Sequence, residues 1–130
     1  MTCNQFLDKN KITDIDSFMN SETAYELRFI SFSYNQIKRF TINPQKEYKV
    51  NTLALNSNQI TLLNLNYLEN MPNLESVLFS NNPVESIVMP TTISNLKIQY
   101  IALPCNIMRR GYFEKMKQNY PKAIAYCSYS

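Results

Sequence analysis

Side chains that commonly catalyse reactions or bind metals are sparse in this chain of 130 residues, and their spacing predicts no active site. Histidine is absent, which removes the commonest general base and the commonest metal ligand. The single glycine, Gly111, cannot form a glycine-rich phosphate loop. No serine or cysteine has a visible activating partner. We therefore expect a protein that is not an enzyme and that uses no metal and no cofactor.

The three cysteines, Cys3, Cys105 and Cys127, lie far apart in the sequence. They form no C-x-x-C pair, so a zinc site is not indicated. Their odd number and wide spacing favour free thiols in a reducing compartment. A bridge between Cys105 and Cys127 is geometrically possible and is the less favoured alternative. The carboxylates of Asp14 and Asp16 are interpreted as solvated or helix-capping groups.

The sequence shows no sign of a membrane or secreted protein. It has no apolar run of about 18 residues, the minimum for a membrane span. Its first nine residues lack the basic-then-apolar layout of a secretory signal. The many asparagines form no N-x-S/T glycosylation site. We expect an intracellular, cytoplasmic protein, and a nuclear location is compatible with the same observations.

Charge is distributed unevenly along the chain, although the net charge is only +3. Residues 1–26 carry two lysines against five carboxylates, whereas residues 97–130 carry six basic side chains against Glu114. This predicts one acidic end and one basic end. The basic end is interpreted either as solvated surface or as a contact for RNA or an acidic partner. Its basic residues are Lys97, Arg109, Arg110, Lys115, Lys117 and Lys122.

An apolar frame, L-x-x-L-x-L-x-x-N-x-L, occurs four times, with an aliphatic or aromatic residue at the L positions. The copies begin at Leu27, Val50, Leu74 and Ile98, and a partial copy begins at Leu7. The asparagines of the four copies are 23, 24 and 24 residues apart, a period typical of one strand plus a return segment. The frame therefore predicts stacked repeats.

These frames, and the three-residue apolar steps that follow the asparagine, resemble the leucine-rich repeat superfamily. They are most similar to the intracellular subclass with a period of about 22–24 residues, which includes protein phosphatase regulators and a spliceosomal ribonucleoprotein subunit. The resemblance implies an α/β solenoid. Such a solenoid is a short, curved, right-handed stack with a parallel concave β-sheet, an irregular or 3₁₀ convex side and a cap at each end.

We expect a single domain over residues 1–130. Residues 1–26 are interpreted as an N-terminal cap or partial repeat, 27–108 as four repeats and 109–130 as a C-terminal cap. Caps are required physically, because an uncovered terminal repeat exposes its apolar face and an unpaired strand edge.

Short helical elements are expected on the convex side and in the caps. The apolar steps of three over residues 68–74 favour a 3₁₀ segment. Asp16 or Ser17 is expected to cap a helix in the first cap. In the second cap, the pattern predicts a helix over 109–119 and a strand over 123–127.

Each repeat strand is expected to turn its L positions into the core and its x positions to the concave surface. The asparagine follows the strand, where its amide can both donate to and accept from backbone groups in the turn. The predicted asparagine ladder comprises Asn10, Asn35, Asn58, Asn82 and Asn106.

The concave x positions form columns that are small and uncharged at the centre, with aromatic residues toward the two ends. Such a face accepts a close-fitting protein surface, and exposed aromatic residues are frequent anchors. The alternative is an unused face that small polar residues keep soluble. The predicted contact residues are Phe29, Ser31, Ser33, Tyr34, Thr52, Ala54, Asn56, Ser76, Leu78, Ser80, Tyr100 and Ala102.

The sequence favours a non-catalytic scaffold or adaptor that binds an unidentified protein through its concave sheet. Five strands give a patch of about 400 Å², whereas a standard interface buries about 800 Å² on each partner. The rims or the basic cap must therefore contribute, or the protein is a fixed component of a larger complex. The alternative function is a structural subunit of a ribosome-like or spliceosome-like ribonucleoprotein whose basic cap contacts RNA. Neither function involves a membrane or a small-molecule substrate.

Overall fold

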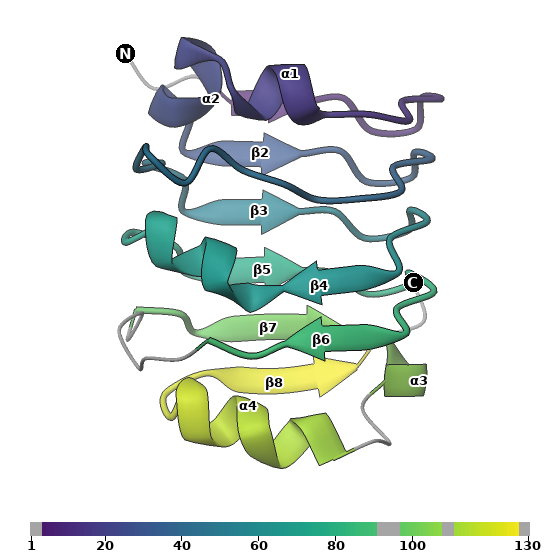
Figure 1. Ribbon diagram of the computed structural model, residues 1–130, viewed down its shortest axis with the longest axis vertical. Helices are drawn as coiled ribbons and strands as arrows, with labels where there is room; N and C mark the ends of the chain where they lie inside the picture. The colour runs from purple at the N-terminus through teal and green to yellow at the C-terminus, as the bar shows by residue number, and fades with distance from the viewer. Residues whose placement is uncertain (1–3, 91–96, 108–110, 128–130) are drawn as a thin grey trace.

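A parallel β-sheet runs along the whole stack in the computed structural model, which describes residues 4–90, 97–107 and 111–127 (Figure 1). Its six strands lie in the order β1-β2-β3-β5-β7-β8, and each neighbouring pair is parallel. This confirms the predicted parallel sheet. The strands are β1 (Asn4–Phe6), β2 (Phe29–Ser31), β3 (Thr52–Ala54), β5 (Ser76–Leu78), β7 (Tyr100–Leu103) and β8 (Ile124–Cys127).

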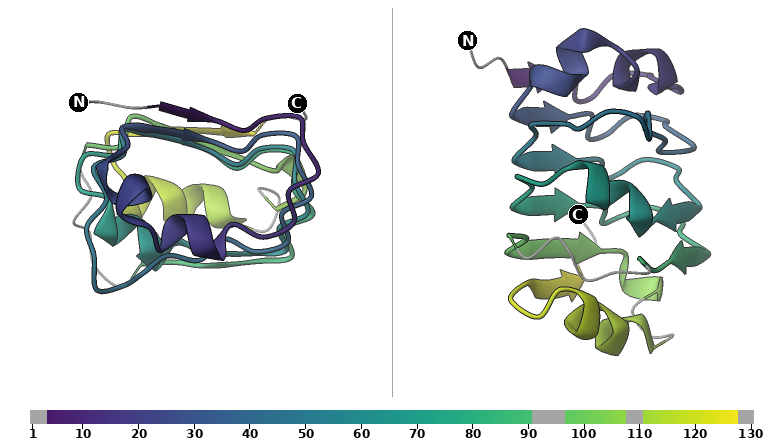
Figure 2. Two further views of the ribbon diagram at one scale, coloured as in Figure 1. Left: turned by 90° about the horizontal axis from the view of Figure 1, so that it is seen from above. Right: turned by 60° about the vertical axis from the view of Figure 1, so that its left-hand side comes forward.

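The return segments lie on the opposite side of the stack from this sheet (Figure 2). There β4 (Leu62–Asn64) and β6 (Ser86–Val88) form a second parallel sheet of two strands. The 3₁₀ helix η1 (Leu65–Asn70) follows β4 and begins and ends earlier than the segment predicted over 68–74. The convex side therefore combines short strands, one 3₁₀ helix and irregular chain.

Short helices lie at both ends of the stack (Figure 1). In place of the one helix expected near the N-terminus there are two, α1 (Asp16–Met19) and α2 (Glu22–Glu26). The capping prediction is wrong, because Ser21 caps α2 by accepting a hydrogen bond from the Ala24 amide at 3.2 Å. At the other end, α3 (Cys105–Ile107) precedes α4 (Phe113–Asn119). Both α4 and β8 fall inside the ranges predicted for a helix and a strand.

The apolar positions of the repeated frame form a continuous core. In the frames that begin at Leu27, Val50 and Leu74, the side chains at every L position are at most 2% exposed. Each such burial contributes about 1.5–3 kcal/mol. Phe32 and Phe79, which replace leucine in two strands, pack on Phe18 and Phe40 with ring centroids 5.1 and 5.9 Å apart. The last L position of the fourth frame, Met108, lies outside the described residues.

Buried asparagine side chains join each repeat to the preceding one. The Asn58 amide nitrogen donates to the carbonyls of Leu55 and Phe32, both at 3.0 Å. Its carbonyl oxygen accepts the amide of Ile37 at 3.1 Å. Asn35 and Asn82 bind their own and the preceding repeat in the same way. These three residues are at most 8% exposed, so water cannot reach the backbone groups of the turn, and the asparagine side chains supply their hydrogen bonds instead.

The residue before the ladder asparagine has a positive φ in four repeats, between 56° and 60°, at Lys9, Tyr34, Ser57 and Asn81. This left-handed backbone conformation is uncommon for residues other than glycine. We infer that the hydrogen bonds of the following asparagine stabilise it. The two terminal asparagines differ from the inner three. Asn10 is exposed and binds carbonyls of its own repeat, and exposed Asn106 lies in α3, which replaces the turn.

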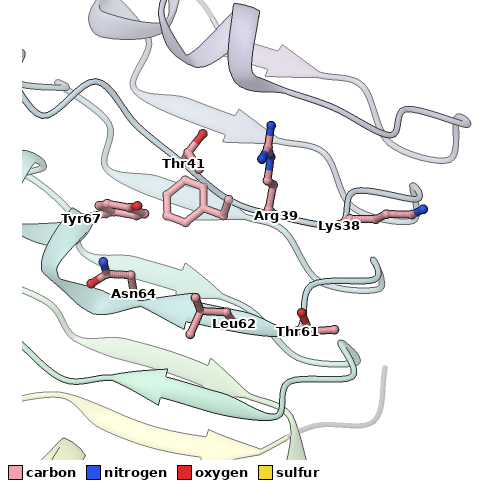
Figure 3. A pocket seen from close by; sticks show the side chains of 8 residues that line it. Lys38, Arg39, Thr41, Thr61, Leu62, Asn64 and Tyr67 are labelled. Carbon is pink, nitrogen blue, oxygen red and sulfur yellow. The ribbon is translucent and has the colours of Figure 1, made fainter.

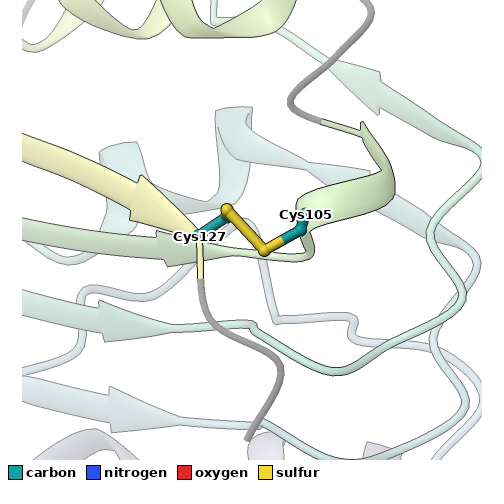
Figure 4. The surroundings of a disulfide bond; sticks show 2 residues. All are labelled: Cys105 and Cys127. Carbon is teal, nitrogen blue, oxygen red and sulfur yellow. A yellow bond between two sulfur atoms is a disulfide. The ribbon is translucent and has the colours of Figure 1, made fainter.

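A disulfide joins Cys105 to Cys127, so the prediction of free thiols is wrong at these two positions (Figure 4). The cause is the register of β8, which places Cys127 opposite Leu103 at the end of β7. Cys105 begins α3 two residues later, and the two Cα atoms lie 4.8 Å apart, within the range that a disulfide spans. Cys3 lies outside the described residues.

We expect the Asn58→Ala substitution to lower the free energy of unfolding by about 1–3 kcal/mol, because it leaves several buried backbone groups unpaired. Asn106→Ala is the matched control, since this exposed side chain has one hydrogen bond, to the Val84 carbonyl, among the described residues. Urea denaturation of both variants measures the difference. Equal losses at the two positions would contradict the role assigned to the buried ladder.

Removing the disulfide is expected to cost about 3 kcal/mol, because it closes a loop across a sequence separation of 22 residues. Thermal unfolding of the wild type with and without dithiothreitol measures this, and Cys127→Ser should match the reduced wild type. Cys3→Ser, which keeps both bridged cysteines, serves as the control and should keep the same response to dithiothreitol as the wild type. A wild type that unfolds at the same temperature in both conditions would show that the bridge adds no stability.

Candidate interaction surfaces

The strand registers align eight of the twelve predicted contact residues in two of the expected columns. Phe29, Thr52, Ser76 and Tyr100 are consecutive neighbours across the sheet. Ser31, Ala54, Leu78 and Ala102 form the next column on the same face. The sequence thus placed these residues on one surface, since parallel strands in register repeat the same facing.

The small residues at the centre of this face expose little surface. Ser31, Ser33, Ala54, Ser80 and Ala102 are all buried, with at most 6% of each residue exposed. Larger neighbours therefore supply any contact with a partner. Phe29, Thr52, Asn56, Ser76 and Leu78 are partly exposed.

Two of the buried serines hold a polar network at the N-terminal end of the sheet. The Ser31 hydroxyl and the Ser33 amide both donate to one carboxylate oxygen of Asp8, at 2.7 and 2.8 Å. The Ser33 hydroxyl donates to the side-chain oxygen of Asn56 at 2.6 Å. These hydrogen bonds join the turns of the first repeats to one another. Because they use polar groups that a partner would otherwise bind, we assign the network to the scaffold.

Exposed aromatic and aliphatic side chains gather instead at the C-terminal end of the sheet. Tyr100 is 44% exposed, and β8 adds Ile124 at 60% and Tyr126 at 40%. Ile124 lies beside Tyr100 in the register, and Tyr126 lies one pleat further along the same face. We call Tyr100, Ile124 and Tyr126 the sheet-end patch. Tyr34, 47% exposed, stands apart near the other end.

Ile124 and Tyr126 were not predicted as contact residues, although their strand was predicted. Their alternation with Ala123 and Ala125 is the signal that would have identified them as face residues. The repeated frame ends before this strand, so the frame itself gave no register for β8.

The basic end of the stack carries four exposed lysines, Lys97, Lys115, Lys117 and Lys122. The ammonium groups of Lys115 and Lys117 lie 5.3 and 4.5 Å from the ring centroids of Tyr112 and Phe113. Within the described ranges, none of the four lysines forms an ion pair. Arg109 and Arg110, predicted with them, lie outside the described residues.

The acidic end already pairs part of its charge internally. Glu26 accepts a hydrogen bond from Lys49 at 2.7 Å, and this bond and charge lower the pKa of the Glu26 carboxyl. Asp16 pairs with Arg39 at 2.9 Å and also accepts a hydrogen bond from Thr41. The lysines of the basic end have no ion-pair partners in the part of the chain that the structure describes, so there the basic end is the more available of the two for an outside charge.

Buried ionisable groups do not form a reactive centre in the described part of the chain. Tyr120 is 2% exposed, its hydroxyl has no hydrogen-bond partner there, and burial together with the Glu69 charge raises its pKa. Burial also raises the pKa of Glu69. Residues 4–90, 97–107 and 111–127 include no group of three or more acidic or cysteine side chains placed to hold a metal. No helix among them is long and apolar enough to cross a membrane.

Comparison with known proteins gives one informative relative. The chain is 30% identical over 95 residues to the U2 small nuclear ribonucleoprotein A′ of Arabidopsis thaliana. The match covers 72% of this chain and 37% of that protein, so this chain spans well under half the length of its relative. No family model matches the chain, and no solved structure matches it significantly.

Proposed function

Because the chain is a leucine-rich repeat protein distantly related to a U2 small nuclear ribonucleoprotein A′, we propose that it is a non-catalytic subunit of a ribonucleoprotein particle. The observation that carries the proposal is the 30% identity over 95 residues. This length spans several repeats, so the similarity is not limited to one copy of the frame. The nucleus is the location that this function implies.

The basic end supports a contact with RNA. Its four exposed lysines have no ion-pair partners among the described residues, so binding a phosphate would break no internal pair. Each phosphate neutralised by a lysine releases condensed counterions, which favours binding and makes it depend on salt. The ammonium groups of Lys115 and Lys117 lie over the rings of Tyr112 and Phe113, and these contacts limit the freedom of both side chains before RNA binds.

We expect the double variant Lys115→Ala/Lys117→Ala to bind RNA more weakly and with less salt dependence. Because this variant neutralises two fewer phosphates, the slope of log K against log salt should fall in magnitude by about 1.4 for single-stranded RNA. Fluorescence anisotropy with an RNA of about 20 nucleotides, from about 50 to 200 mM salt, measures the slope. Lys9→Ala/Lys11→Ala removes the same charge from the acidic end and is the control. An unchanged slope in the first variant would overturn the RNA contact.

A protein contact on the sheet face is the second candidate function, and the sheet-end patch favours it. Three large side chains on adjacent strands are 40–60% exposed, and aromatic residues grouped in this way are typical interface anchors. A ribonucleoprotein subunit needs protein neighbours as well as RNA, so the two functions are compatible.

The variant Tyr100→Ala/Tyr126→Ala tests the sheet face. We expect it to weaken binding of the particle's protein neighbour by roughly 2 kcal/mol or more, the loss typical of anchor residues. The neighbour is first identified by affinity purification and mass spectrometry, and the two purified proteins are then titrated by calorimetry. Tyr34→Ala removes an equally exposed tyrosine at the other end of the face and is the control. Equal affinities of wild type and double variant would contradict this contact.

A further inference from the structure

A groove of about 310 Å³ opens on the convex side, between the return segment of the first repeat and β4 of the second (Figure 3). Residues 38–41 line one wall, and Thr61, Leu62, Asn64 and Tyr67 line the other. The volume is at the lower end of the range for ligand pockets. The groove lies on the opposite side of the stack from the sheet-end patch, so it is a separate site.

The floor of the groove is apolar, although the groove is open to solvent. Phe40 is 4% exposed and packs edge to face on Tyr67, with ring centroids 5.8 Å apart. Leu62 is 50% exposed and lines the opposite wall. Val88, on the neighbouring strand β6, is 42% exposed but does not line the groove. Phe40, Leu62 and Tyr67 thus give the groove an apolar floor.

The edge of β4 that borders the groove pairs with no other strand among the described residues. In the β4–β6 pair, Leu63 lies opposite Ile87, and Ser86 donates to the Thr61 carbonyl at 3.4 Å. The alternation of a parallel ladder then points the backbone groups of Leu62 and Asn64 away from β6, toward the groove.

A backbone hydrogen bond joins the first and second repeats just before the groove, and their return segments diverge along the groove. Gln59 donates its amide to the Ile37 carbonyl at 2.8 Å. Beyond that point, no backbone hydrogen bond in the described chain joins residues 38–41 to β4. An unpaired strand edge of this kind is a template for another extended chain.

The charge at the rim selects an acidic occupant. Lys38 and Arg39 both line the groove, and none of the lining residues is acidic. Figure 3 shows both residues on the wall opposite Leu62, where the Arg39 side chain points toward the preceding repeat and the Lys38 side chain extends away from Tyr67. Arg39 is bound to Asp16, yet its side chain remains 70% exposed, and Lys38 has no ion pair within the described ranges.

We propose that this groove binds an extended, acidic segment of a partner protein. The segment adds as a third strand to the edge of β4, seats one apolar side chain over Leu62 beside Phe40 and Tyr67, and places a carboxylate near Lys38. The backbone edge favours a protein over RNA. The alternating N–H and C=O groups of a strand edge pair with those of another peptide backbone, and an RNA backbone has no such alternating groups. The proposal does not depend on the ribonucleoprotein function.

Selection of a random linear peptide library on the purified protein tests the site. The peptides enriched on the wild type should share one bulky apolar residue flanked by Asp or Glu. In calorimetric titrations, the best peptide should lose at least about tenfold in affinity for Leu62→Lys and for Lys38→Glu. Val88→Lys introduces the same charge on the same small sheet, one strand away from the groove, and should bind as the wild type does. Thermal unfolding of each variant verifies that it is folded.

Backbone N-methylation of the peptide separates strand addition from simple side-chain docking. Methyl groups on the alternate amides that pair with β4 should abolish binding, whereas methyl groups on the intervening amides should leave it intact. The proposal is overturned if no acidic–apolar peptide is enriched or if Leu62→Lys binds as tightly as the wild type. It also fails if both methylated series bind equally, or if Lys38→Glu weakens binding of a single-stranded RNA but of no peptide.

Discussion

The structure depends on one contact, the bond between a buried asparagine amide and the backbone of two successive repeats. A sharp turn after each strand leaves carbonyl and amide groups without partners, and burial makes such groups costly. The amide of Asn58 satisfies groups in its own repeat and in the preceding one at once. A one-residue slip of any strand would break both sets of bonds, so the same contact fixes the parallel register.

That contact explains which parts of the fold could be predicted. The period of the asparagines gave the repeats, and the alternation around them gave the buried positions and the aligned columns from Phe29 to Tyr100. Prediction failed where the contact ends. In the fourth repeat α3 replaces the turn and Asn106 is exposed. The disulfide of Cys105 ties the last strand in its place, and the frame contained no information about the register of that strand.

The interaction surfaces were predicted less well, because exposure depends on what surrounds a side chain and not on its facing alone. Ser31 faces the concave side as expected, yet it is 3% exposed and bound to Asp8. The groove has no sequence signature, since it arises where successive return segments differ. Residues 38–41 run as unpaired chain beside a strand of the next repeat, and two unlike segments cannot pack along their whole length.

The irregularity of the return segments has a consequence for how so small a stack could serve an assembly. A fully regular convex side would pair each return segment with the next and leave no free strand edge between them. Here the sheet is regular because the asparagines enforce it. On the convex side Asn70 joins its repeat to the carbonyls of Pro44 and Lys46, but among the described strands β4 pairs with β6 alone. The rigid sheet therefore holds the two unlike surfaces, the sheet-end patch and the convex groove, at a fixed separation. The sheet-end patch and the convex groove share no residues, so the two contacts proposed for them would not compete with each other.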